Sequence, residues 1–281
     1  MRALLVLAVA AASAMAHPAY NIAADKRGNL FFLDWPQKRV MKVTPEGKMT
    51  EFASLRGVAS DTDPHALTFD AKGNLLVAAT YKSRFWTISP TAKIVERKPP
   101  ALLAGDDILN LAATPAGDLF LVAATRVVHK NGTVRRTRYR VLSIPRQGKP
   151  RVVFETNSGT LYVGSLVATK DGTVYLTHDN ALYKVSAGSQ RVLAKEFRTP
   201  YGLCEDKRGN LVVAEFDGNR IQRVTPGGKT TLITAAVDSP YAVCLAPGGS
   251  FWVAEYGRGM HRIRLLDASG KIKTVATLKT R

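Results

Sequence analysis

The sequence lacks the motifs that mark several common classes of enzyme. It has only two cysteines in 281 residues, too few for a disulfide framework in a domain of this size. It has no Gly-rich phosphate loop, zinc-finger spacing, CxxC pair or serine nucleophile elbow. Helical periodicity is absent throughout, while short apolar runs bounded by turn residues are frequent. These absences favour an all-β protein with no standard nucleotide or structural zinc site.

Long apolar runs are absent after the first 16 residues. Before that point, Arg2 is followed by an apolar run from Ala3 to Ala14 and by the small-x-small triplet 14–16. This pattern is typical of a secretory signal peptide and is too short to span a bilayer. We therefore expect residues 1–16 to be a signal peptide and 17–281 to form the mature, periplasmic or secreted protein without a membrane span. A buried N-terminal helix or strand is the alternative.

Acidic residues are few compared with basic ones: 22 Asp and Glu stand against 40 Lys and Arg, a net charge of +18. Such a surface attracts acidic polymers, phosphates, acidic proteins or anionic membranes. Export makes nucleic acid an unexpected partner, and we expect a monomer. A generally basic surface without a particular partner is the alternative interpretation.

One phrase recurs along the chain, and its clearest copy is residues 200–233, PYGLCEDKRGNLVVAEFDGNRIQRVTPGGKTTLI. The segment 206–210 (DKRGN) separates two apolar runs. An Asp opens such a turn by bonding its own backbone, and Gly209 accepts the positive φ that closes it. The strand that follows, 211–214, is apolar on both faces, as expected where sheets pack face to face.

The phrase occurs six times. Its turn glycines are Gly28, Gly73, Gly117, Gly172, Gly209 and Gly249. The spacings of 45, 44, 55, 37 and 40 residues match the length of a four-stranded propeller blade. We predict one six-bladed β-propeller of four-stranded antiparallel blades, with each blade holding four consecutive strands. The expected blades are about 17–58, 59–103, 104–157, 158–197, 198–236 and 237–281.

The succession Pro-x-Gly-Leu, Asp-x-x-Gly-Asn, Val-Ala-Glu and Asn-x-Arg-Ile-Gln, read in 200–222, resembles the NHL repeat. It is also similar to the repeats of the regucalcin/gluconolactonase group and of the streptogramin lyases. The resemblance covers 18–281. It implies the propeller fold and leaves the activity open, since this architecture carries hydrolases, lyases, isomerases and binding domains.

The repeat predicts which residues surround one end of the central channel, which we call the mouth. The inner strand of each blade begins there and the second strand ends there. The beginnings of the inner strands carry Tyr20, His65, Leu109, Gly164, Tyr201 and Tyr241, followed one step further by Asn21, Asn110 and four small residues. The ends of the second strands carry Asp34, Ala79, Ala123, His178, Glu215 and Glu255.

These groups suggest acid/base chemistry or a divalent cation such as calcium, magnesium or zinc. As metal ligands we expect Glu215, Glu255, Asp34 and Asn110. As catalytic residues we expect His178, Glu215 and His65. The alternative is structural: each acid precedes an arginine of the next strand, at 39, 220 or 262, and could simply pair with it. His178, likewise, could be a structural hydrogen-bonding group.

Tyr20, Tyr201, Tyr241 and Asn110 are expected to contact a ligand, although the tyrosines could simply wall the channel. The enlarged turn of the third blade, 126–140 (RVVHKNGTVRRTRYR), should project on the mouth side. Its Arg135 and Arg136 could grip an anion, or the hairpin could be a solvated loop. The acids at 106 and 107 could add a cation ligand or only solubilise their loop. The two cysteines, Cys204 and Cys244, share a column in neighbouring blades, so a disulfide and two buried thiols both stay open.

The family resemblances carry over only in part. In gluconolactonase-like proteins acids and an Asn at or near the starts of the inner strands hold the metal, and here Tyr201 and Gly164 stand at two such positions. The resemblance to streptogramin lyases lies in 63–66 (DPHA), 199–202 (TPYG) and Glu215. It implies a site of Tyr, His and Glu around magnesium, with Tyr20, His65, Glu215 and Glu255 in matching columns, but that family has seven blades.

Two functional hypotheses follow. The first is a metal-assisted lactone or ester hydrolase, or a lyase, acting on a small anionic ligand at the mouth. The second is a non-catalytic NHL-type module that binds an acidic polymer or protein.

The signal peptide is directly testable. Because the triplet 14–16 fits a cleavage site, N-terminal sequencing of the protein from its native host should begin at His17. A mature chain that still begins at Met1 would contradict export.

Overall fold

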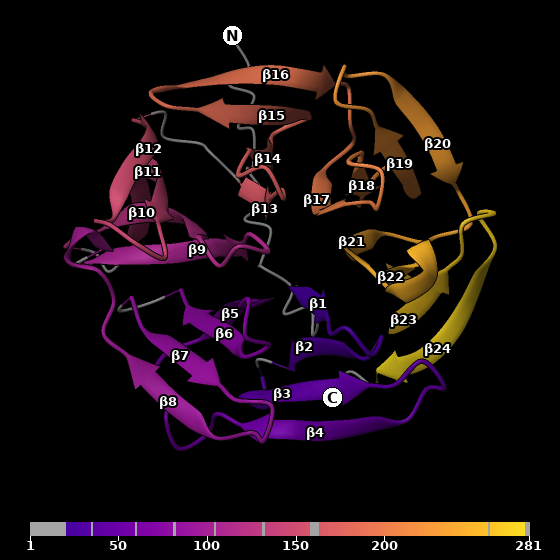
Figure 1. Cartoon of the computed structure of the whole chain (residues 1–281), viewed down its shortest axis with the longest axis horizontal. Helices are drawn as coiled ribbons and strands as arrows, with labels where there is room; N and C mark the ends of the chain where they lie inside the picture. The colour runs from indigo at the N-terminus through magenta and orange to yellow at the C-terminus, as the bar shows by residue number, and fades with distance from the viewer. Residues whose placement is uncertain are drawn as a thin grey trace, which may run out of the picture.

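The computed structural model describes residues 21–34, 36–59, 61–80, 83–103, 105–130, 133–157, 163–257 and 259–278. Within these residues the chain forms six four-stranded antiparallel sheets arranged as blades around a central axis (Figure 1). This confirms the predicted six-bladed propeller. The proposed signal peptide, 1–16, and Tyr20 lie outside the described residues. No helix in the described ranges has the length and apolarity to cross a bilayer.

Each blade uses four consecutive strands, numbered outward from the axis. Blades 1 to 3 consist of β1 (Ile22–Ala24), β2 (Leu30–Asp34), β3 (Arg39–Val43) and β4 (Met49–Ser54); β5 (Pro64–Phe69), β6 (Leu75–Ala79), β7 (Phe85–Ile88) and β8 (Ile94–Arg97); and β9 (Asp106–Ala113), β10 (Leu119–Val128), β11 (Val134–Ile144) and β12 (Arg151–Thr156).

Blades 4 to 6 follow the same plan. They consist of β13 (Val163–Ala168), β14 (Val174–His178), β15 (Ala181–Ser186) and β16 (Ser189–Lys195); β17 (Pro200–Glu205), β18 (Leu211–Glu215), β19 (Arg220–Val224) and β20 (Thr230–Thr234); and β21 (Pro240–Leu245), β22 (Phe251–Gly257), β23 (Met260–Leu266) and β24 (Ile272–Leu278). Two short 3-10 turns, η1 (Ala101–Leu103) and η2 (Pro247–Gly249), complete the described regular structure.

The first turn of the repeat forms as its sequence predicts. In blade 5, Asp206 Oδ1 accepts the backbone N–H groups of Arg208 and Asn210 at 2.8 and 2.9 Å. Gly209 closes the turn with φ +76°, a conformation that a residue with a Cβ adopts at a cost. This local chemistry fixes the register of β17 against β18, in which Leu203 lies opposite Val213.

The hydrophobic core is divided into six layers, each lying between two neighbouring blades. The layer between blades 6 and 1, for example, contains Trp252 from β22 and Phe32 from β2, both almost fully buried. Trp252 also donates its indole N–H to the backbone carbonyl of Gly28 at 3.2 Å. This contact between the last and first blades closes the ring without exchanging a strand.

The inner strands approach one another closely at the axis. A Cβ added to Gly164 of β13 would lie 2.3 Å from the carbonyl oxygen of Pro200 in β17. A Cβ on Gly202 of β17 would lie 2.9 Å from the amide nitrogen of Val243 in β21. Both distances are shorter than van der Waals contact allows, so these glycines permit neighbouring backbones to pack directly.

This close approach predicts the effect of adding one methyl group. Gly164→Ala should lower the free energy of unfolding by about 2 kcal/mol, because backbone cannot move aside as a flexible side chain can. Gly57→Ala is the matched control, since nothing lies within 4 Å of its added Cβ and its φ is not positive. Urea unfolding of the two variants measures the difference, and equal stabilities would contradict the close packing.

Candidate functional site

A cavity of about 250 Å³ follows the axis and is lined by all six inner strands. Its mouth end is polar and includes Asn21, Asn110 and Tyr201, whereas Ala24 and Phe69 lie toward its other end. The amide of Asn21 donates to Asn110 Oδ1 at 3.4 Å, and the amide of Asn110 donates to the carbonyl of Gly164 at 3.5 Å. The expected placement of these amides at the channel mouth is therefore observed.

The three predicted acids at the strand ends are held by side chains of their own blades. Glu215 has no exposed surface, and its carboxylate accepts N–H groups of Arg220 at 2.7 and 3.0 Å. It also accepts the side-chain N–H of Gln222 and, at 2.7 Å, the backbone N–H of Arg198. Glu215 therefore pairs with the arginine of the next strand, as the structural alternative expected.

The same arrangement occurs in two further blades. Glu255, also without exposed surface, lies 2.7 Å from Arg262 Nε and 2.5 Å from Arg264 Nη1. Asp34 lies 2.8 Å from Arg39 Nε. These ion pairs join the second strand of a blade to the third and occupy the carboxylate oxygens.

The proposed metal ligands therefore do not converge on one point. Glu215, Glu255 and Asp34 are each paired with arginine on separate blades, and Asn110 bonds the channel backbone. Among the described residues no group of three His, Cys, Asp or Glu side chains has a metal-binding arrangement. A divalent cation stays a prediction from the sequence, and these four residues do not provide its ligand set.

His178 lies inside blade 4 rather than among the residues that line the channel cavity. Its ring is stacked on Tyr183 with centroids 3.8 Å apart, and only 5% of its surface is exposed. Its Nδ1 lies 3.2 Å from Asp179 Oδ2 and its Nε2 lies 3.2 Å from the amide nitrogen of Gln190. The structure thus holds this imidazole with partners of its own blade.

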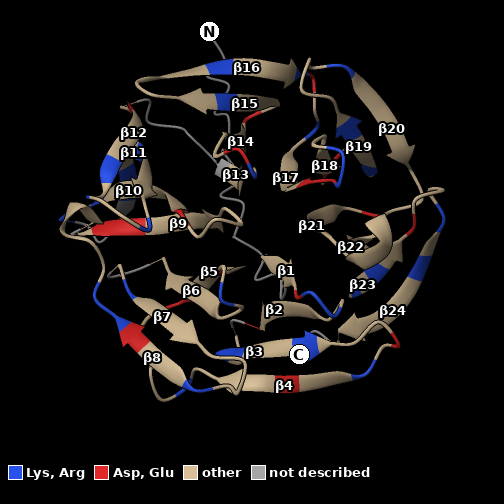
Figure 2. Ribbon diagram, viewed as in Figure 1, with Lys and Arg blue, Asp and Glu red and all other residues tan. Residues whose placement is uncertain are grey.

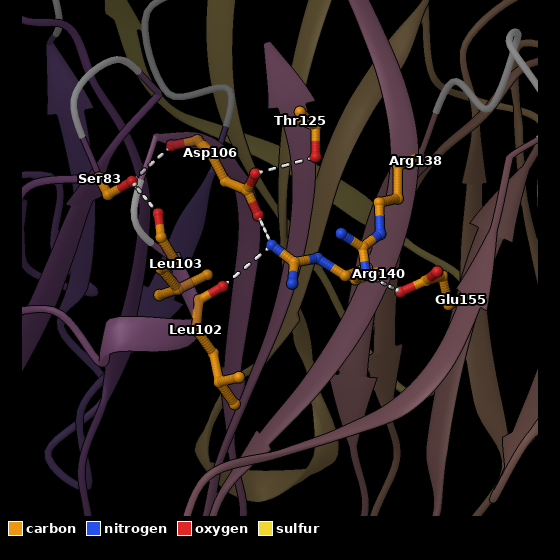
Figure 3. A network of polar contacts seen from close by, with 8 residues as sticks. All are labelled: Ser83, Leu102, Leu103, Asp106, Thr125, Arg138, Arg140 and Glu155. Carbon is orange, nitrogen blue, oxygen red and sulfur yellow. Dashed lines mark hydrogen bonds and ion pairs between the residues drawn. The ribbon is translucent and has the colours of Figure 1, made fainter.

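Blade 3 rises above its neighbours on the mouth side. There β10 and β11 continue as a long hairpin beyond the first residue of β9. Asp106, at the beginning of β9, anchors the base of this hairpin (Figure 3). Its carboxylate accepts from Thr125 at 3.1 Å and forms a buried ion pair with Arg140. Ser83, from blade 2, donates to the carbonyl of Leu103 at 2.7 Å and so joins the same network.

Asp107, the neighbouring acid, faces a different environment. Its Oδ2 lies 2.9 Å from Arg136 Nε on the hairpin, whereas its buried Oδ1 has no hydrogen-bond partner. Only 1% of its side chain is exposed, and this burial raises its pKa despite the opposing charges of Arg136 and Arg126. The predicted ligand-binding Arg136 is thus placed by a buried acid.

His65, at the beginning of the inner strand of blade 2, lies within the field of Arg136. The ring of His65 is half-buried, and this burial, with the positive charge of Arg136 as the smaller cause, lowers its pKa to about 4. The imidazole is therefore neutral at physiological pH and able to accept a proton. The charge of Arg136 in blade 3 thus acts on a residue of blade 2. Arg135 is exposed, and strand alternation puts it on the face of β11 opposite to Arg136.

The two described tyrosines differ in exposure. Tyr201 is partly exposed, lines the channel cavity, and packs on Phe216 with ring centroids 5.2 Å apart. Tyr241 is 1% exposed; its hydroxyl lies 3.2 Å from His261 Nδ1, and burial raises its pKa. Tyr241 therefore helps to build the layer between blades 6 and 1.

Phe216, Tyr256 and His261 were not among the residues expected at the mouth. The rings of Tyr256 and His261 lie 4.6 Å apart, beside Tyr241. Phe216 and Tyr256 directly follow the acids Glu215 and Glu255, so an aromatic residue one step beyond each acid was the signal available in the repeat.

The two cysteines are free and buried. Cys204 packs in the layer between blades 5 and 6, whereas Cys244 packs in the layer between blades 6 and 1. Burial raises the pKa of both thiols. The buried-thiol alternative is the one observed.

The chain is a six-bladed propeller with a pocket on its axis. Several solved structures of known proteins resemble it. No protein-family model matches the sequence, and no curated protein matches it. The structure resembles virginiamycin B lyase from Staphylococcus aureus, with 21% identity, a TM-score of 0.61, and coverage of 92% of this chain and 84% of the lyase.

Two further solved structures are similar. A gluconolactonase from Xanthomonas campestris has 11% identity and a TM-score of 0.65, covering 84% of this chain and 82% of that one. A luciferin-regenerating enzyme has 16% identity and a TM-score of 0.62, with coverage of 84% and 82%. The predicted resemblance to streptogramin-lyase-like and gluconolactonase-like propellers is confirmed at the level of the fold.

The contacts of Glu215 predict a loss of stability on its substitution. Glu215→Gln should lower the free energy of unfolding by about 3 kcal/mol, because it removes the charge that Arg220 and the Arg198 amide surround. Glu96→Gln is the control: that pair with Arg84 is half-exposed, so the change should cost about 1 kcal/mol or less. Thermal and urea melts measure both, and an unchanged Glu215→Gln variant would show that the pairing is dispensable.

Proposed function

We propose that this chain is an exported enzyme that opens a small anionic lactone or ester at the channel mouth, as a hydrolase or a lyase. The observations that support the proposal are the lowered pKa of His65, to which the charge of Arg136 contributes, and the polar end of the axial cavity, which is lined by Asn21, Asn110 and Tyr201. A base and an anion-binding group in one place are what this chemistry requires. The solved lyase and gluconolactonase propellers support the class without identifying the substrate.

In the hydrolytic form, His65 takes a proton from water while the water oxygen bonds to the acyl carbon. The bond from that carbon to the ring or ester oxygen then breaks, and the leaving oxygen takes up the proton. In the lyase form, His65 removes a proton next to the carbon that loses the oxygen, and a double bond forms. Arg136 holds negative charge on the ligand in either case.

The low pKa of His65 has a consequence for catalysis. An anion bound to Arg136 cancels the positive charge that disfavours the imidazolium. Binding of the ligand therefore raises the pKa of His65 and makes it a stronger base once the substrate is present. Asp107 keeps Arg136 in place through its bonded oxygen.

Activity against a panel of lactones and aryl esters tests the proposal. His65→Gln should lower kcat/KM by about 100-fold or more, because it removes the base without changing the fold. His178→Gln gives the contrast: its ring is held inside blade 4, so the variant should melt earlier and keep its turnover at temperatures where it is folded. Loss of turnover in His178→Gln alone would overturn the assignment.

The pH profile gives a separate test. Because the pKa of free His65 is about 4, kcat/KM should be constant from pH 8 to about pH 5 and fall as the imidazole is protonated below that. Arg136→Gln should move the midpoint upward by less than the full distance to an ordinary histidine, since burial is the larger cause. A wild-type midpoint near pH 6.5 would contradict the described environment of His65.

A further inference from the structure

The two sides of the mouth differ in chemistry. Each blade contacts its neighbours in sequence and blade 6 contacts blade 1, so blade 3 stands opposite blade 6, with blade 5 beside it (Figure 1). Blade 3 carries the basic hairpin, whereas blades 5 and 6 carry the aromatic residues. Figure 2 shows basic segments around the whole ring, so net charge alone does not single out blade 3. Blade 3 differs from the other blades in the way its hairpin positions arginine side chains around a buried acid.

Two arginines on the hairpin share one face. Arg126 and Arg136 are directly opposite in the β10–β11 ladder, so their side chains leave the same side of the sheet. Both act on the buried Asp107, Arg136 through an ion pair and Arg126 through its charge. Positive charge therefore gathers on this face of the hairpin.

The hairpin reaches well above the mouth. Ala123 of β10 occupies the repeat position of Glu215, where β18 ends, and β10 continues to Val128. Five further residues of extended chain add about 15 Å. The positive face therefore forms a wall beside the channel opening.

The opposite side is aromatic and accessible. Tyr201, Phe216 and Tyr256 are each partly exposed at the mouth end of blades 5 and 6. They rest on a buried base, in which Tyr241 and His261 are 1% and 2% exposed. Partly exposed rings on a rigid support favour a flat apolar group of a ligand.

We propose that the mouth binds an amphipathic organic anion, with its aromatic or large apolar group on Tyr201, Phe216 and Tyr256 and its negative group at Arg126 and Arg136. The inference rests on the proposed function for the location of the site, and it adds the class of substrate. Asn21 and Asn110 line the axial cavity between the two sides. A small polar sugar acid or a bare inorganic anion would use only one side.

The probe is 1-anilinonaphthalene-8-sulfonate, whose fluorescence rises in apolar surroundings. Its neutral counterpart N-phenyl-1-naphthylamine lacks the sulfonate, and methanesulfonate lacks the rings. The sulfonate dye should bind at one site and about tenfold tighter than either comparison compound, because only it engages both sides. Equal affinities for the charged and neutral dyes would overturn the proposal.

Variants locate the two ends. Arg126→Gln should weaken dye binding by about tenfold, since it removes a charged donor at the wall. Arg135→Gln is the matched control, because it makes the same change on the opposite face of the same hairpin and should leave the affinity unchanged. Phe216→Leu should weaken binding by about fivefold through loss of ring contact, and Tyr256→Leu serves if that variant does not fold. Equal losses in Arg126→Gln and Arg135→Gln would show non-specific attraction.

The failure of this inference is distinguishable from failure of the proposed enzyme. Dye binding involves no chemical step, so it is measured independently of turnover. Specific dye binding without lactone or ester turnover would remove the enzyme and keep the ligand class. Turnover of lactones with flat dye binding across the variants would keep the enzyme and overturn the ligand class.

Discussion

Direct packing of neighbouring backbones around the axis is the constraint on which the rest of this structure depends. The inner strands of blades 4, 5 and 6 come so close that Gly164 and Gly202 have no room for a Cβ. This packing brings the beginnings of all six inner strands to one opening. Residues more than 100 positions apart in sequence, such as Asn21 and Tyr201, thereby line the same cavity.

Acidic residues in this propeller serve two purposes. Their hydrogen bonds show which acids are structural and which belong to a functional site. Glu215, Glu255 and Asp106 have their oxygens occupied by arginines and other donors, so they fasten strands within a blade. Asp107 is bonded through one oxygen only and holds Arg136 near His65. Complete pairing indicates structure, while an incompletely paired buried acid with a perturbed neighbour indicates a functional site.

The fold could be predicted from the sequence because each blade repeats its own turn chemistry. The Asp that opens a turn and the Gly that closes it recur at blade spacing, and their hydrogen bonds form as expected. The positions of Asn110 and Tyr201 beside the axial cavity followed from aligning these turns. Aligning the repeats shows which residues occupy equivalent positions, and this is sufficient to predict where each lies along the backbone of its blade.

The contacts within the site could not be predicted in the same way. Whether Glu215 faces a ligand or Arg220 depends on the neighbouring strand, and the sequence left both possibilities open. The effect of Arg136 on His65 depends on the height of the β10–β11 hairpin, which an alignment on the turn glycine does not give. Phe216 and Tyr256 were missed because the expected strands ended one residue before each of them. Phe216 does follow β18, whereas β22 continues through Tyr256.

Burial, with a smaller contribution from the positive charge of Arg136, keeps His65 neutral at physiological pH. Nuclear magnetic resonance of protein with labelled histidine measures its titration directly. The account predicts a midpoint near pH 4 in the free protein and an upward shift when an anion occupies Arg136. A midpoint near pH 6.5 that no anion moves would contradict it.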